Sequence, residues 1–194
     1  MGKGRLEAFS DGVLAIIITI MVLEMKVPMG TSLHALAAQV PVFLSYVLSY
    51  VYVGIYWNNH HHMLHAASRV DGAVLWANLH LLFWLSLFPF ATAWMGENHL
   101  ATLPTAVYGV ILMAASIAYW VLLQTLIALQ GAGSVLKRAV GGDRKGKTST
   151  LLYACGIVLA FWRPWAAQAV YAAVALVWLV PDRRIERALD SEAS

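Results

Sequence analysis

The chain has 194 residues, of which 60% are hydrophobic and only 12% are charged, and its formal net charge is +3. Its mean hydropathy is +0.68. Soluble globular domains carry roughly 25% charged residues, so the composition excludes an ordinary soluble protein and predicts an all-α integral membrane protein. In such a protein the small positive charge gives no reason to expect a nucleic-acid partner; membrane lipids are the expected surroundings.

Six apolar segments follow one another along the chain. They run over about Leu6–Val27, Leu36–Trp57, Ala73–Met95, Leu103–Leu129, Ser149–Trp162 and Trp165–Val180. About 20 apolar residues are needed for a helix to cross a bilayer, so the first four segments are long enough. The last two are shorter and meet at Arg163-Pro164, which leaves open a tilted pair of spans or a re-entrant hairpin.

The longest connection, residues 130–148, is rich in glycine and basic residues. Such composition is typical of a flexible connector, so we expect a cytoplasmic linker between the fourth and fifth helices. Residues 1–194 are therefore expected to form a single six-span membrane subunit, an all-α six-helix bundle.

The basic residues predict the orientation of this bundle. With a cytoplasmic N-terminus, all but Lys26 and Arg163 of the 13 lysines and arginines fall on the cytoplasmic side. Cytoplasmic loops of membrane proteins carry an excess of Lys and Arg. We therefore expect a multi-pass protein of the cell (inner) membrane with both termini in the cytoplasm.

The first apolar segment has two distinct faces. Its apolar stripe contains Ile16, Thr19, Ile20 and Leu23 at helical spacing, while Asp11 lies about 140° around the helix from Ile16. Polar residues inside a membrane are costly and are functional candidates. We expect Asp11 to point toward neighbouring helices. The stripe is explained either by ordinary packing or lipid contact, or by a hydrophobic constriction around a symmetry axis, which is one way to gate a channel.

Depth in the membrane indicates which residues surround Asp11. The second segment ends on the cytoplasmic side and the third begins there, so several polar side chains should share one level. These are Ser10, Asp11, Trp57, His60, His61 and Asn78. The histidines are unaccompanied by acidic or thiol ligands, so a hydrogen-bonded network is favoured over a zinc site, and we expect neither a metal nor a cofactor. Arg5 either joins this network or remains at the cytoplasmic mouth.

These residues resemble the transmembrane protein 175 (TMEM175) family of potassium channels. The first-helix signature of that family is R-x-x-x-F-S-D, and Arg5, Phe9, Ser10 and Asp11 fill it without departure. "YWNNHHH" at the end of the second segment and "NLHLLFWLSLFPFATAW" in the third, with Asn78 and Pro89-Phe90, match further family patterns. Specific motifs thus cover about the first half of the chain.

The resemblance implies a homotetramer whose first helices line a central pore, without the pore loop of ordinary potassium channels. The constricting isoleucine of the family corresponds to Ile16, its filter-associated threonine to Thr19, and its further apolar layers to Ile20 and Leu23. The permeant ion would be K⁺, with a weaker preference over Na⁺, and the partners would be other copies of the chain and monovalent cations. "VYVGIYW" (residues 51–57) looks a little like a filter motif, but it lies within an uninterrupted apolar segment and is interpreted as plain helix.

Two other classes of protein remain as alternatives to this potassium-permeable cation channel. A proton-coupled secondary transporter of a small solute would use Asp11 or the histidines, but the chain shows no internal repeat or paired broken helices. A membrane enzyme would use His60–His65 and Asp71, but no nucleophile or ligand set supports it. We therefore expect no enzymatic activity.

Overall fold

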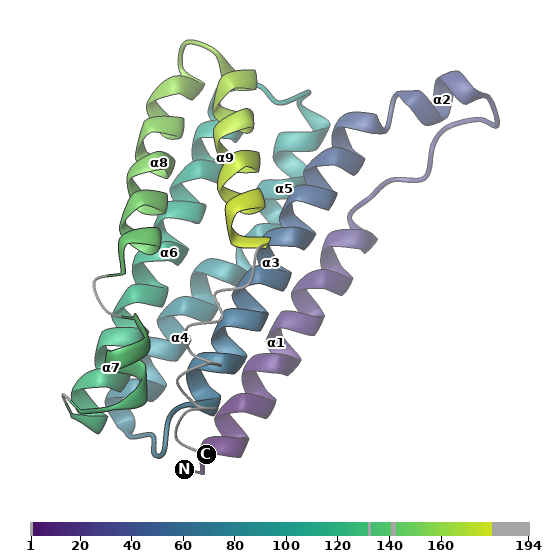
Figure 1. The fold of residues 1–194 in the computed structure, drawn as a ribbon. Helices are drawn as coiled ribbons and strands as arrows, with labels where there is room; N and C mark the ends of the chain where they lie inside the picture. Colours follow the sequence, from purple (N-terminus) through teal and green to yellow (C-terminus); the bar gives the residue numbers. More distant parts are fainter. Residues whose placement is uncertain (1, 132, 141–142, 180–194) are drawn as a thin grey trace.

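The computed structural model describes residues 2–131, 133–140 and 143–179. Within these ranges the chain forms nine α-helices and no strands (Figure 1). The helices are α1 (Lys3–Leu23), α2 (Leu33–Ala37), α3 (Val40–His65), α4 (Gly72–Ser86), α5 (Phe88–Glu97), α6 (Thr102–Gln130), α7 (Val135–Val140), α8 (Arg144–Ala160) and α9 (Pro164–Leu179).

Four helical stretches are long and apolar enough to cross a membrane. They are α1, α3, the consecutive helices α4 and α5, and α6. These are the first four predicted spans, and they make the chain a multi-pass membrane protein. The shorter helices α8 and α9 form a hairpin that packs on α6 (Figure 1), and whether both cross the membrane stays a prediction.

The third predicted segment is interrupted rather than continuous. α4 ends at Ser86 and α5 begins at Phe88, with Leu87 joining them at φ −85° and ψ −7°. The interruption follows from Pro89 in the first turn of α5, because proline has no N–H to donate and its ring obstructs the preceding helical turn. Together the two helices form one stretch, Gly72–Glu97, that is long and apolar enough to cross a membrane.

The predicted ends of the first two segments also differ from the structure. α1 ends at Leu23, four residues before Val27, and α3 continues to His65, eight residues beyond Trp57. The polar run at residues 58–62, expected at the cytoplasmic end of the second helix, continues the helical hydrogen bonding of α3. α3 therefore extends past the end of the apolar segment.

The connection between α6 and α8 is shorter in the structure than the predicted linker, residues 130–148. α7 lies inside it, and α8 already begins at Arg144. The start of α8 is explained by Asp143, whose carboxylate accepts a hydrogen bond from the Gly146 backbone N–H at 3.2 Å, a capping contact that satisfies an otherwise unpaired helix N–H. Val180 and the basic residues 183, 184 and 187 lie outside the described residues.

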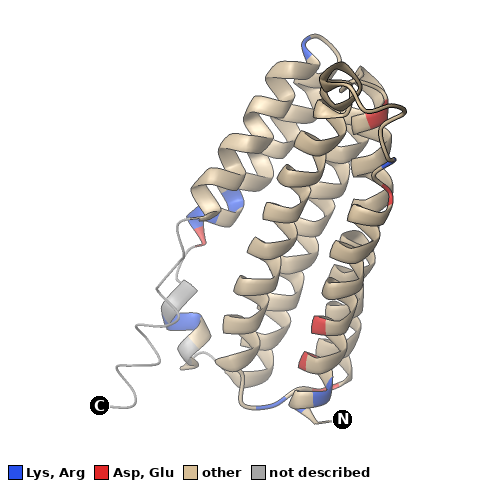
Figure 2. Ribbon diagram, turned by 90° about the vertical axis from the view of Figure 1, so that its right-hand side faces the viewer, with Lys and Arg blue, Asp and Glu red and all other residues tan. Residues whose placement is uncertain are grey.

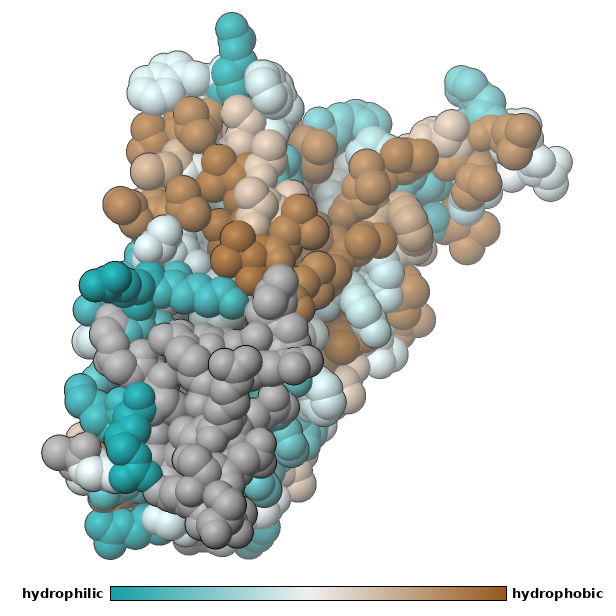
Figure 3. Space-filling view, in the orientation of Figure 1, coloured by the Kyte–Doolittle hydropathy of each residue, from teal (hydrophilic) through white to brown (hydrophobic). Residues whose placement is uncertain are grey.

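The surface has the character of a membrane protein. Among the described residues, charged side chains gather near the helix ends and in connecting segments, apart from Glu7 and Asp11 in α1 (Figure 2). In Figure 3, hydrophobic side chains gather on the upper part of the face shown, over α9 and α3. This distribution is the one expected where exposed apolar faces meet lipid rather than water.

Candidate functional site

α1 lies at the edge of the bundle, where it packs against α3, α4 and α5 (Figure 1). Its anchored face consists of the buried residues Leu6, Ser10, Leu14, Ile17 and Met21. On another face of the helix, Ile16 is 59% exposed, Ile20 40% and Leu23 75%, and Thr19 is exposed as well. The exposed stripe predicted from periodicity, Ile16, Thr19, Ile20 and Leu23, is therefore uncovered in a single chain.

A buried chain of hydrogen bonds holds the anchored face in register. The Asn78 side-chain amide donates to Ser10 Oγ at 2.9 Å, and Ser10 Oγ donates to the Leu6 carbonyl at 2.9 Å. The Asn78 Oδ1 atom accepts from His60 Nε2 at 2.7 Å. His60 therefore carries its proton on Nε2, since the amide oxygen of Asn78 has nothing to donate.

These contacts join three helices at one depth. Ser10 and Asn78 are fully buried and His60 is 3% exposed, so each bond is shielded from water. Because an unpaired polar group in an apolar interior is costly, this network favours one rotation of α1 relative to α3 and α4. That rotation determines which side chains of α1 remain uncovered.

Asp11 lies at the margin of this interface rather than inside it. Its Oδ1 atom accepts a hydrogen bond from Trp57 Nε1 at 3.0 Å, and both residues are exposed in the single chain. The Trp57 ring is stacked on His61, with ring centroids 6.2 Å apart, and His61 is stacked in turn on His65. The Asp11 carboxylate is thus oriented by α3.

The remaining motif residues lie near the start of α1. Arg5 is exposed and Phe9 is 50% exposed, so neither belongs to the buried network. Lys3 donates to the His65 carbonyl at 3.0 Å, which ties the start of α1 to the end of α3. Within the described ranges, no group of three His, Cys, Asp or Glu residues could hold a metal ion.

Thr19 places a polar atom in the exposed stripe. Its hydroxyl donates to the Ala15 carbonyl at 2.9 Å, so its hydrogen is used inside the helix. The Oγ1 lone pairs remain as acceptors on the exposed side. The stripe can therefore offer oxygen to a cation at one level and hydrocarbon at the levels of Ile16, Ile20 and Leu23.

Residues 51–57 lie inside α3, which is helical without interruption from Val40 to His65. Their backbone carbonyls belong to the helical ladder, as the sequence interpretation of "VYVGIYW" required.

Sequence reasoning missed a second buried polar network, on the other helices. Ser49 Oγ lies 2.6 Å from Thr92 Oγ1 and 2.9 Å from the Tyr108 hydroxyl, linking α3, α5 and α6. The signal was present in the sequence, because each of these residues interrupts an apolar run. This network stiffens the helices against which α1 packs.

The sequence is similar to those of proteins named as potassium channels. The family model "Endosomal/lysosomal potassium channel TMEM175" matches residues 5–89. A protein of Chryseobacterium sp. (strain P1-3) named a potassium channel is 54% identical over 189 residues, which cover 97% of this chain and 98% of that protein. A potassium channel of Streptomyces collinus is 39% identical over 125 residues, covering 60% of this chain and 61% of that protein.

A solved structure agrees with the fold. The crystal structure described as a lysosomal potassium-selective channel TMEM175 homolog from Chamaesiphon minutus superposes with a TM-score of 0.81 and 28% identity. The alignment covers 93% of this chain and 97% of that one. All of these relatives are named as channels, not as enzymes.

Proposed function

We propose, from the premise that this chain belongs to the TMEM175 family, that it is a potassium-permeable cation channel. Four copies assemble around a central axis, and the α1 helix of each copy lines the pore with its exposed stripe. The observation that carries this proposal is the division of α1 into an anchored face and a second face that is uncovered.

The polar residues of α1 favour a water-filled axis over lipid on the uncovered side. Arg5 and Thr19 are exposed in the single chain, on the same side of α1 as Ile16. Ionisable groups inside a membrane almost always face a bundle interior or a water-filled cavity, because exposure to hydrocarbon is costly. A central pore supplies that water.

Within this pore, Ile16 forms the main hydrophobic constriction. A ring of four isoleucine side chains narrows the path and disfavours water, which is a recognised gating principle. Thr19 lies about 4.5 Å further along the helix axis, so its hydroxyl oxygens replace part of the water that a cation loses at the constriction. Ile20 and Leu23 continue the apolar lining.

The ion preference of such a pore is modest. Side-chain hydroxyls, rather than rings of backbone carbonyls, contact the ion, and the filter-like residues 51–57 are part of a continuous helix. We therefore expect K⁺ to be preferred over Na⁺ only weakly. We place the protein in the cell membrane with both termini cytoplasmic, so that Asp11 and the α3 histidines lie near the inner mouth.

Single-channel recording tests the function. The purified full chain, in planar bilayers with opposed K⁺ and Na⁺ gradients, should give unitary currents. Their reversal potential should be shifted from zero toward the K⁺ equilibrium potential. Silent bilayers together with saturable, proton-dependent solute uptake by vesicles would instead establish the secondary transporter. Native mass spectrometry should show four copies per complex, and a stable monomer contradicts the central pore.

Cysteine labelling tests which residues line the pore. The only native cysteine is Cys155, so Cys155→Ser supplies a clean background. A charged methanethiosulfonate should block the current through Thr19→Cys channels and leave Met21→Cys channels unaffected, because Met21 is 2% exposed on the anchored face. Equal block of both variants contradicts the assignment of the stripe.

A further inference from the structure

A cavity of about 550 Å³ opens between α3, α6, α8 and α9, and α1 contributes none of its lining residues. Its volume lies within the range of roughly 300–1,000 Å³ typical of ligand pockets. The lining is mostly apolar and aromatic, and includes Ile55, Met113, Ile117 and Leu151. The cavity is therefore separate from the proposed pore.

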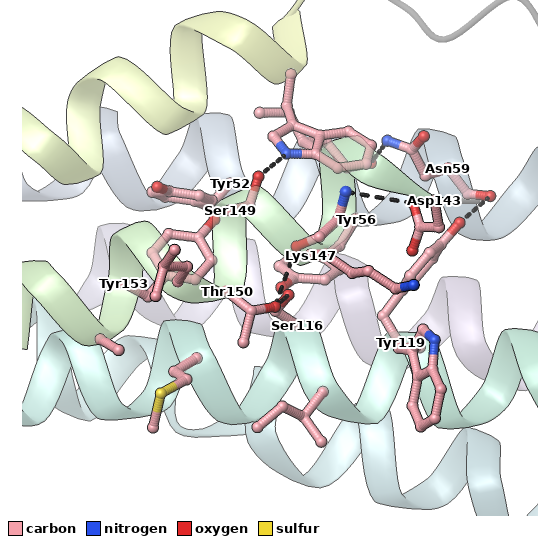
Figure 4. A pocket seen from close by; sticks show the side chains of 18 residues that line it. Tyr52, Tyr56, Asn59, Ser116, Tyr119, Asp143, Lys147, Ser149, Thr150 and Tyr153 are labelled. Carbon is pink, nitrogen blue, oxygen red and sulfur yellow. Dashed lines mark hydrogen bonds between the residues drawn. The ribbon is translucent and has the colours of Figure 1, made fainter. Parts of the chain in front are cut away.

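The two ends of the cavity differ in chemistry. In Figure 4, Asn59, Tyr119 and Asp143 lie at one end, and the Lys147 side chain points toward them, while Tyr52 and Tyr153 line the other end. A ligand that fits both ends must itself be amphipathic.

Polar groups along the wall are already bonded to one another. Ser116 and Thr150 form a hydrogen bond of 2.8 Å, and Trp178 donates to Ser149 at 2.8 Å. Because these donors are occupied within the protein, the middle of the cavity suits a hydrocarbon chain better than a sugar or another polar solute.

The polar end carries positive charge. Residues 143–147 contain three lysines and arginines and one acidic residue, Asp143. Asp143 caps α8, Lys145 lies over the Trp178 ring at 4.4 Å, and Arg144 and Lys147 are exposed. Basic clusters between membrane helices on the cytoplasmic side attract anionic lipid headgroups.

The cavity wall is continuous with surface that faces the membrane. Three lining residues are also large, exposed hydrophobic side chains: Ile117 is 43% exposed, Trp120 44% and Leu151 65%. A lipid chain could therefore enter sideways from the bilayer, without crossing a polar barrier.

We propose that this cavity binds one acyl chain of an anionic phospholipid, whose headgroup phosphate lies on Lys147 and its neighbour Arg144. Lipid binding at this cavity does not depend on ion permeation, so its test is separate from the test of the channel function.

Native mass spectrometry of the detergent-solubilised full chain tests this site. Wild type and variants are incubated with phosphatidylglycerol, or with phosphatidylcholine of identical acyl chains, and the retained lipid is counted per subunit. Lys147→Gln removes the charge, and Ala154→Leu fills part of the cavity. Their matched controls are Lys137→Gln on α7 and Ala173→Leu on α9, both exposed and outside the cavity.

Wild type should retain phosphatidylglycerol in preference to phosphatidylcholine. Lys147→Gln should lower that retention about fivefold, since one basic contact to an anionic headgroup is worth about that factor. Ala154→Leu should lower it for both headgroups, and the two controls should match wild type. Melting curves verify that every variant is folded.

Three results overturn the proposal. If wild type retains phosphatidylglycerol and phosphatidylcholine equally, the bound lipid is only the annular lipid around the protein. If Lys147→Gln and Ala154→Leu both retain as much phosphatidylglycerol as wild type does, any bound lipid lies outside this cavity. If the wild-type chain retains neither lipid, the cavity is not a phospholipid site.

Discussion

The side-chain amide of Asn78 on α4 donates a hydrogen bond to Ser10 Oγ on α1 at 2.9 Å, and both side chains are completely buried. The same asparagine accepts from His60 on α3. One side chain thus fixes the rotation of α1 against two neighbouring helices. Every property proposed for the uncovered face of α1 depends on that rotation.

Removing the asparagine amide should therefore destabilise the subunit. Asn78→Ala leaves Ser10 and His60 without this partner, and an unsatisfied buried polar group costs about 1–3 kcal/mol. Unfolding of the detergent-solubilised protein measures the loss. Asn98→Ala is the matched control, because the side-chain amide of exposed Asn98 donates to the Trp94 carbonyl in the last turn of its own helix. Equal stability of the two variants contradicts the anchoring role of Asn78.

Much of this interface was predictable from periodicity and depth. Helical spacing separates Ile16 from Asp11, and the ends of neighbouring segments place His60 and Asn78 at the level of Ser10. The break at Leu87 and the early start of α8 were missed, because each depends on one local backbone contact inside a segment whose composition indicates otherwise. The cavity was beyond sequence reasoning, since it requires the placement of α3, α6 and the α8–α9 hairpin relative to one another.

Two glycines make room for a tyrosine between α6, α8 and α9. A Cβ at Gly109 would overlap the Tyr171 hydroxyl, and one at Gly156 would overlap the Tyr171 ring. Gly156→Ala should therefore destabilise the protein by about 1–3 kcal/mol, as overpacking of a core does. Thermal unfolding compares it with Gly54→Ala in α3, where a Cβ meets nothing within 4 Å and alanine is the better helix former.

Restoring space should reverse this effect. The double variant Gly156→Ala with Tyr171→Leu should show no additional loss from the alanine beyond that of Tyr171→Leu alone. Strict additivity of the two substitutions contradicts the packing explanation, because residues that share a contact are expected to couple.

An ion pair outside the spans connects the segment after α1 to the end of α5. Lys26 Nζ lies 2.7 Å from Glu97 Oε1, and the hydrogen bond to Glu97 raises the pKa of Lys26 above its ordinary value of 10.5. Because the folded state binds this proton more tightly, the stabilisation is complete below pH 10.5 and is lost as pH rises through the raised pKa. The contribution is small, since the pair is exposed to solvent.

Melting temperatures from pH 8 to 11.5 check this sign. The difference between wild type and Lys26→Met should be constant at the lower pH values and should shrink at the highest. Lys137→Met, at an exposed position of α7, controls for the general loss of a positive charge. A difference that grows with pH contradicts the assignment.

The most direct measurement compares two adjacent isoleucines of α1 by single-channel recording and unfolding. Ile16 is 59% exposed and Ile17 is 3% exposed. Ile16→Ala should change the unitary current or the K⁺ over Na⁺ preference with little effect on stability, because its side chain faces the pore. Ile17→Ala should lower stability by about 2–5 kcal/mol and leave the unitary current of the assembled channels unchanged. If the current instead follows Ile17 and is indifferent to Ile16, the exposed stripe of α1 does not line the pore.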